Sequence, residues 1–127
     1  MSDTNWPPEL DALVAAPKHH RLLLENDRVR VLDTEIAPGE RTPLHTHHWC
    51  AVHYIVSWSD FVRRDAEGAT LVDTRGREPM SGALWGPPLG PHSLENVGSR
   101  PIRVISVEVK ESTGHGQKPA SGLVSSA

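Results

Sequence analysis

Two histidines stand two residues apart in the stretch Pro38–His47, which reads PGERTPLHTH. Side chains alternate between the two faces of an extended chain, so His45 and His47 are expected to point to the same side. Two imidazoles placed in this way can bind one metal ion at about 2.0–2.1 Å. Taken alone, the pair is only a weak indication of a metal site.

A second stretch, Pro87–Asn96, reads PPLGPHSLEN and supplies a third histidine, His92, after a turn rich in proline and glycine. Together the two stretches resemble the two motifs of the cupin superfamily. The first motif, Gly-x5-His-x-His, is matched by Gly39, His45 and His47. The second, Gly-x5-Pro-x-Gly-x2-His-x3-Asn, has one residue fewer before its histidine here and is matched by Gly82, Pro88, Gly90, His92 and Asn96. The resemblance spans residues 22–110 and marks a small, single-domain cupin.

The rest of the chain predicts an all-β fold. Short β-like runs alternate with turn signals built from Gly, Pro, Asp and Asn, and no convincing helix separates them. The runs are Arg21–Glu25, Val29–Ile36, Ala51–Trp58, Phe61–Arg64, Thr70–Asp73, Ala83–Trp85 and Ile102–Lys110. This pattern is typical of an antiparallel sandwich or barrel. The resemblance implies the double-stranded β-helix, or jelly-roll barrel, of the cupins.

Three segments are expected along the chain. Residues 1–18 form an N-terminal arm with one short helical candidate, Pro8–Ala16, bounded by prolines. Residues 19–110 form the barrel. Residues 111–127 are expected to be a flexible tail, because they contain too little apolar surface to fold.

The resemblance implies that His45, His47 and His92 converge inside the barrel to hold a divalent metal, with Asn96 bracing a turn. One departure stands out: Ala51 occupies the place of the family's glutamate ligand. Cysteine-dioxygenase-like cupins also lack it and use three histidines, so a metal is still expected. With three neutral ligands the ion keeps its full charge, which favours an anionic, chelating substrate.

The other histidines are placed by counting positions along each strand, because side chains at alternate positions (the same parity) share a face. His53 is expected on the inward face as a fourth metal ligand, a catalytic proton shuttle or a hydrogen-bond donor behind the ligands, or else as a buried neutral histidine bound to backbone. His48 has the opposite parity and should face outward. His19 and His20 are expected at the surface unless the arm folds over the barrel mouth.

Parity also predicts side chains of the pocket wall. Arg41 is expected to face inward and bind a substrate carboxylate, the alternative being a rim arginine paired with Glu40 or Glu95. Two tryptophans, Trp49 and Trp85, are placed inward by the same count. Glu108, in the last predicted strand, is interpreted either as a carboxylate near the barrel opening or as part of a solvated strand end.

Composition limits the function classes. The 127 residues suit one domain, and 13 Lys and Arg against 16 Asp and Glu leave a net charge of −3. The basic residues are scattered, which argues against nucleic acid as a partner. No run reaches the ~18 apolar residues of a membrane span. A single cysteine, Cys50, and the lack of a leader-like start favour the cytoplasm.

The sequence therefore predicts a metalloenzyme of dioxygenase, isomerase or lyase type that acts on a small anionic metabolite. Iron is the metal expected first, with zinc, nickel or manganese as alternatives, and His53 and Arg41 are the candidate catalytic residues. A non-catalytic small-molecule-binding or sensing cupin is the alternative. The segment Leu23–Val31 also resembles small bacterial cupins associated with β-alanine degradation. A homodimer is expected, because small cupins commonly pair through edge strands.

Overall fold

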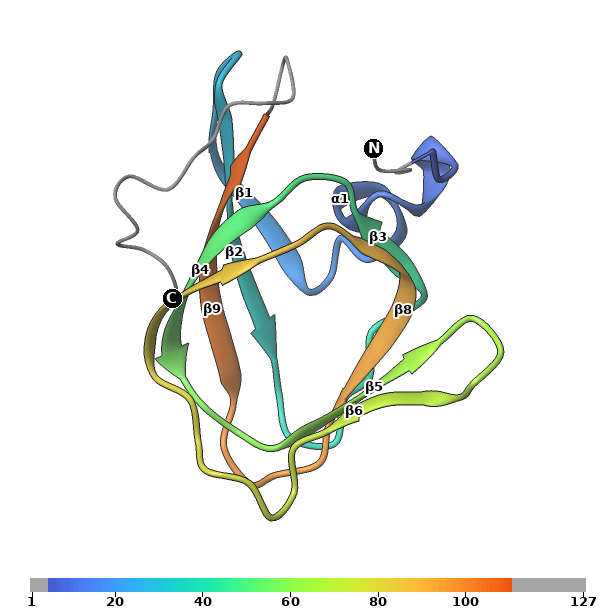
Figure 1. Cartoon of the computed structure of the whole chain (residues 1–127), viewed down its shortest axis with the longest axis vertical. Coiled ribbons are helices and arrows are strands. Elements are labelled where there is room, and N and C mark those ends of the chain that lie inside the picture. The colour runs from blue at the N-terminus through green and yellow to red at the C-terminus, as the bar shows by residue number, and fades with distance from the viewer. Residues whose placement is uncertain (1–4, 111–127) are drawn as a thin grey trace.

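A computed structural model describes residues 5–110, which form two facing antiparallel sheets (Figure 1). The larger sheet has the order β1-β2-β9-β4-β7, from β1 (His20–Glu25), β2 (Val29–Ile36), β9 (Ile102–Val109), β4 (Ala51–Ser57) and β7 (Gly82–Gly86). The smaller has the order β3-β8-β5-β6, from β3 (His45–His47), β8 (Leu89–Asn96), β5 (Phe61–Asp65) and β6 (Thr70–Asp73). This arrangement confirms the all-β double-stranded β-helix. The predicted tail, residues 111–127, lies outside the described residues.

The seven predicted β-like runs correspond to strands of the barrel, with ends that differ by at most one residue. Alternation is visible in β4, where Ala51 is buried while Val52, Tyr54 and Val56 are exposed. The strands that carry the cupin histidines, β3 and β8, lack this clear apolar alternation, because β3 consists of His45, Thr46 and His47 and β8 mixes His92 with Leu94 on its inward side.

Asn96 ties together the loops at the end of the barrel remote from the arm. Its side-chain amide donates to the carbonyls of Ile36 and Arg100, at 2.9 and 2.8 Å. The amide oxygen accepts from the Ser59 hydroxyl at 2.8 Å and from the Gly98 amide at 2.9 Å. All four hydrogen bonds of this buried group are made, which confirms its predicted structural role.

The N-terminal arm packs against the β3–β8 side of the barrel (Figure 1). It contains the short η1 (Pro8–Leu10) and α1 (Ala12–Ala15), and the Asp11 side chain caps α1 by accepting from the Leu13 amide at 3.0 Å. Asp11 also forms a parallel bridge with Thr46 of β3. The Trp6 ring lies so close to Gly90 that a Cβ there would approach it to 3.2 Å. In this described part of the chain, neither helix has the length and apolar character needed to cross a membrane.

Candidate metal centre

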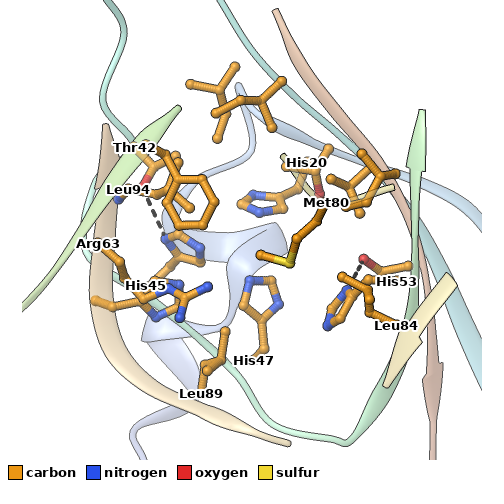
Figure 2. A pocket seen from close by; sticks show the side chains of 18 of the residues that line it. His20, Thr42, His45, His47, His53, Arg63, Met80, Leu84, Leu89 and Leu94 are labelled. Carbon is orange, nitrogen blue, oxygen red and sulfur yellow. Dashed lines mark hydrogen bonds between the residues drawn. The ribbon is translucent and has the colours of Figure 1, made fainter. Parts of the chain in front are cut away.

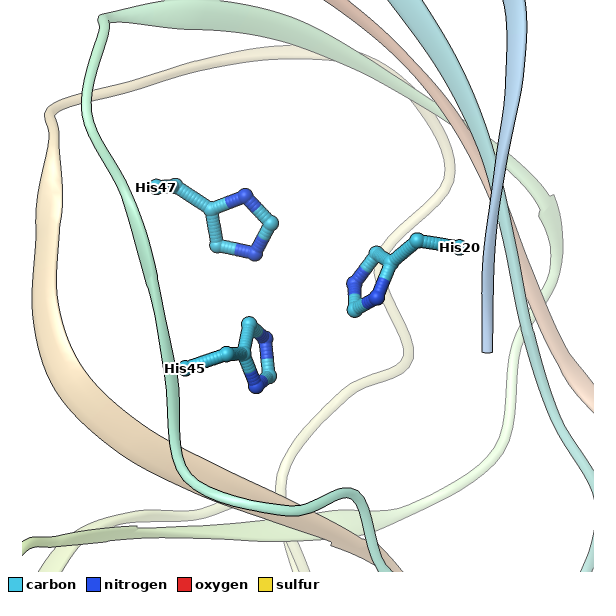
Figure 3. Close-up of side chains that lie close together, drawn as sticks. All are labelled: His20, His45 and His47. Atoms are coloured by element: carbon cyan, nitrogen blue, oxygen red, sulfur yellow. The ribbon is translucent and has the colours of Figure 1, made fainter. Parts of the chain in front are cut away.

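Three imidazoles meet at the arm end of the barrel interior (Figure 3). His45 and His47 come from β3, and His20 is the first residue of β1 in the opposite sheet. Each offers one ring nitrogen, and these nitrogens all lie within 4.8 Å of one another. Three nitrogen donors this close can converge on one ion with small side-chain adjustments.

The hydrogen bonds of the rings leave their Nε2 atoms available. In three of the histidines, Nδ1 lies at hydrogen-bond distance from a backbone carbonyl: His20 with Ala16 at 3.0 Å, His45 with Pro43 at 2.9 Å and His92 with Gly90 at 2.7 Å. A carbonyl only accepts, so Nδ1 must carry the proton and Nε2 must carry the lone pair. Metal-binding histidines are oriented by the same kind of contact. The donor set therefore fits a divalent ion.

His92 lies beside this cluster. It is the direct cross-strand partner of His45, with ring centroids 4.3 Å apart, and its ring is 5.5 Å from that of His47. Among the described residues, the group of three ligand nitrogens that lie within 4.8 Å of one another is nevertheless the one that includes His20. The structure thus brings the predicted three histidines together and adds a fourth.

His20 was expected at the surface unless the arm covered the barrel mouth, and that exception is what the structure shows. Its side chain is buried, because the end of α1 approaches β1 and the Ala16 carbonyl accepts a hydrogen bond from its Nδ1. His19 is buried as well, but it does not line the cavity, and its Nε2 lies 3.3 Å from the Glu40 carboxylate. No periodicity distinguishes these two histidines, since only the path of the arm decides their surroundings.

Burial keeps the imidazoles neutral. It lowers the pKa of His45 to about 2, helped by the neighbouring His47 and His92, and the pKa of His92 to about 4. The pKa of His47 is held well below its ordinary value by burial and, next, by the neighbouring His20 and His92. Protons therefore do not compete for the Nε2 lone pairs near neutral pH.

Glu108 lies directly behind His47, and its interpretation as a solvated strand end was wrong. The side chain is 1% exposed, and its Oε2 atom is 3.3 Å from His47 Nδ1. In the β4–β9 pairing, Glu108 stands opposite Ala51, the position that lacks the family's glutamate. A carboxylate is thus supplied by the neighbouring strand, where it contacts the ring nitrogen remote from the cluster. Such a contact orients a ligand histidine and raises its basicity.

Arg30 connects this carboxylate to the arm. Its Nε donates to Glu108 Oε1 at 2.7 Å, and its two terminal nitrogens donate to Asp11 at 3.1 and 2.9 Å. Burial raises the pKa of Glu108, and the guanidinium opposes that shift. For Asp11 the same guanidinium outweighs burial and lowers the pKa of the carboxyl. A continuous ionic chain, Asp11–Arg30–Glu108, therefore runs from the arm to His47.

The cluster opens onto a cavity of about 180 Å³ inside the barrel (Figure 2). One side of the cavity carries His20, His45, His47 and His92. Most of the remaining wall is apolar and includes Trp58, Phe61, Leu84, Leu94, Ile102 and Val104. A bound ion would therefore face a small, largely apolar chamber.

His53 also lines this cavity, as its parity predicted, but it does not belong to the group of closest nitrogens. Its Nδ1 lies 2.7 Å from the Ser106 hydroxyl. Its Nε2 packs against Gly86, where a Cβ would come within 2.7 Å of it. Burial lowers the pKa of this imidazole too. The position suits a proton carrier in the chamber wall.

Three predictions for the pocket wall were wrong. The Arg41 side chain is exposed, and its backbone forms an isolated bridge with Glu95. Trp85 is 52% exposed, and Trp49 lies outside the cavity lining, 5.1 Å from the Arg30 guanidinium. Parity fails at Arg41 and Trp49 because both lie in irregular loops beside β3. His48 is also outside the lining, as expected, with its ring edge-on to Trp49.

Comparison with known proteins identifies the fold. No family model matches the sequence, and no curated protein matches it. Among solved structures, a cupin domain from Bordetella pertussis has a TM-score of 0.58 at 20% identity, over 72% of this chain and 92% of that one. The polyketide cyclase RemF from Streptomyces resistomycificus has a TM-score of 0.51 at 25% identity, over 76% of this chain and 68% of that one. An RmlC-like cupin from Methanocaldococcus jannaschii has a TM-score of 0.51 at 12% identity, over 71% and 77% of the two chains. This chain has the cupin fold, and its histidine cluster supports a metal-binding cupin.

Proposed function

We propose that the chain is a metalloenzyme that acts on a small anionic, chelating metabolite. His45 and His47, together with either His20 or His92, would supply the ligands of one divalent ion, iron first and zinc, nickel or manganese otherwise. The observation that carries the proposal is a set of neutral imidazoles with free Nε2 atoms at the edge of a cavity. An ion bound there would act as a Lewis acid toward an oxygen of the substrate or toward O2 or water.

His53 is the proposed acid or base of the reaction. It reaches the same cavity from β4, and the Ser106 hydroxyl holds its ring in place. Arg41, the other predicted catalytic residue, is not proposed again because its side chain is exposed. A Lewis-acidic ion beside an acid or base is compatible with dioxygenase, isomerase or lyase chemistry. The similarity to RemF, itself a cyclase, favours an enzyme over a passive barrel.

Metal content is the direct test. Untagged protein purified from defined medium should contain close to one transition-metal ion per chain after reconstitution with Fe(II) or Zn(II), measured by plasma mass spectrometry. His45→Ala and His47→Ala should abolish binding, whereas the matched control His48→Ala should leave it intact. Less than about a tenth of an ion per wild-type chain would contradict the proposal, given that structural metal sites bind with about 10–16 kcal/mol.

The number of nitrogens favours one second candidate. If His20 and His92 both join His45 and His47, four nitrogens fill the coordination sphere of a tetrahedral ion. No position is then open to a substrate, which fits a non-catalytic binding or sensing role. The visible absorption of the cobalt form separates the two: a weak five- or six-coordinate spectrum leaves room for substrate, and an intense tetrahedral one that no ligand perturbs supports the sensor.

We also propose a homodimer formed through the outer face of the larger sheet. Val52, Tyr54 and Trp85 are exposed on this face by 37%, 53% and 52%. Contiguous exposed apolar side chains are typical of an interaction surface, and a second copy is the simplest occupant. Light scattering after size exclusion should give a dimer that Tyr54→Asp converts to a monomer. Leu71→Asp, equally exposed but on β6, is the control, and a monomeric wild type would reject the proposal.

A further inference from the structure

Two adjacent arginines of β5 point in opposite directions. Arg64 faces outward and donates to the Glu95 carboxylate at 2.8 Å. Arg63 faces the cavity, since it pairs with Leu94 of β8, which lines the cavity and stands two residues from His92. Figure 2 shows Arg63 projecting into the space that His45 and His47 also face. A diagonal cross-strand neighbour lies within reach of a long side chain, so Arg63 and His92 share one corner of the chamber.

No group in residues 5–110 balances the charge of Arg63. Its Nε is shielded from solvent without a hydrogen-bond partner, and no carboxylate or carbonyl there accepts from the rest of the guanidinium. Its guanidinium lies over the Phe61 ring, 5.6 Å from the ring centroid. Burial without a nearby anion lowers the pKa of this guanidinium. An unpaired, half-buried cation in a largely apolar cavity is unfavourable for folding, so its natural complement is an anion that enters from outside the chain.

The surroundings of Arg63 indicate which kind of anion would fit. The neighbouring imidazoles are neutral, and a bound divalent ion would add positive charge on the same side. The opposite walls are apolar, with Trp58, Leu84 and Val104. A cavity of about 150 Å³ holds a benzene molecule, so the volume here suits a ligand in which the anionic group is attached to one ring or to a short acyl chain. Guanidinium groups bind carboxylates through two parallel hydrogen bonds.

We propose that Arg63 is the anion-binding residue of the cavity, and that the ligand is a monocarboxylate with a compact apolar body. The inference rests on the proposed function only for what happens to that ligand after it binds. Arg63 thereby takes the substrate-binding role that the sequence had placed on Arg41.

Calorimetric titration of the full-length protein with benzoate and with neutral benzamide tests the proposal. It is performed on zinc-loaded protein and on protein dialysed against chelator, so that binding by Arg63 is separated from binding by the metal. Wild type should bind benzoate more tightly than benzamide in both forms. Arg63→Met should weaken benzoate binding about 10- to 100-fold, as expected for a charge-assisted hydrogen-bonded pair, and should leave benzamide unchanged. The benzoate affinity of Arg63→Lys should fall between those of wild type and Arg63→Met, and Arg64→Met is the matched control.

Equal affinities for the two probes, no benzoate binding by wild type, or an unchanged affinity in Arg63→Met would each overturn the proposal. An Arg64→Met variant as defective as Arg63→Met would overturn it too, since the loss would then not come from the cavity. Urea unfolding of each variant checks that the fold is intact. If the protein binds no metal but still binds benzoate through Arg63, the proposed metalloenzyme is rejected and this anion site is kept. If it binds metal but shows no Arg63-dependent benzoate binding, the anion site is rejected and the proposed metalloenzyme is kept.

Discussion

Arg30 and Arg63 reach the interior of the same barrel from facing sheets, but only one of them has partners. Arg30 on β2 donates to Glu108 and, with two nitrogens, to Asp11. Arg63 on β5 makes no hydrogen bond or ion pair within the described chain. A cation that the chain itself balances stabilises the scaffold, whereas a cation left unbalanced is available to a ligand. The two sites should therefore respond to the same substitution in opposite ways.

The largest effect is expected at Arg30. Arg30→Met would leave the buried carboxylate of Glu108 and that of Asp11 without their partner, so the free energy of unfolding in urea should fall by about 3–5 kcal/mol. The matched control is Arg75→Met, which breaks a pair with Asp73 that is exposed on both sides and should leave the free energy of unfolding nearly unchanged. Equal effects in the two variants would contradict the structural role of Arg30.

Glu108→Gln should act on the metal rather than mainly on the fold. The amide keeps the shape of the side chain but removes the charge behind His47 Nδ1, so zinc affinity should fall about 10- to 100-fold in competition with a chromophoric chelator. Glu95→Gln, on the outer pair with Arg64, is the control and should bind zinc like wild type. Unchanged affinity in Glu108→Gln would show that the ionic chain ends before the metal site.

Asp11→Asn tests how much the N-terminal arm contributes to stability and to metal binding. Its carboxylate is at the outer end of the chain and is partly exposed, so the expected loss in the free energy of unfolding is about 1–2 kcal/mol, less than for Arg30→Met. Zinc affinity should decrease less than in Glu108→Gln. An effect on zinc larger than that of Glu108→Gln would mean that the arm acts through His20, which the Ala16 carbonyl holds, more than through His47.

The smallest effect on stability is expected at Arg63, and its sign is reversed. Arg63→Met removes an unpaired charge from an apolar wall, so the free energy of unfolding of the ligand-free protein should stay constant or rise by about 1 kcal/mol. Chemical denaturation without added anions measures it. A loss of several kcal/mol would reveal a partner for Arg63 and would remove the contrast with Arg30.

Much of the barrel could be predicted from the sequence because strand signals are local. Alternation and turn residues located seven of the nine strands, and the spacing of the cupin motifs placed His45, His47 and His92 together. The two strands without apolar alternation, β3 and β8, were recognisable only through those histidines. Parity worked for His53 in a regular strand and failed for Arg41, where the chain leaves the extended conformation.

The sequence by itself therefore determined the class of fold and three histidines of the centre, because both depend on short-range periodicity and spacing. Only the tertiary structure decided which groups complete the site. His20 enters the cluster because the arm turns back onto β1, and Glu108 reaches His47 from a residue 61 positions away. Arg30 and Arg63 look alike in the sequence, and they differ because one meets carboxylates of the adjacent strand and of the arm and the other faces an apolar wall. The balance of buried charge depends on long-range contacts, which no local pattern encodes.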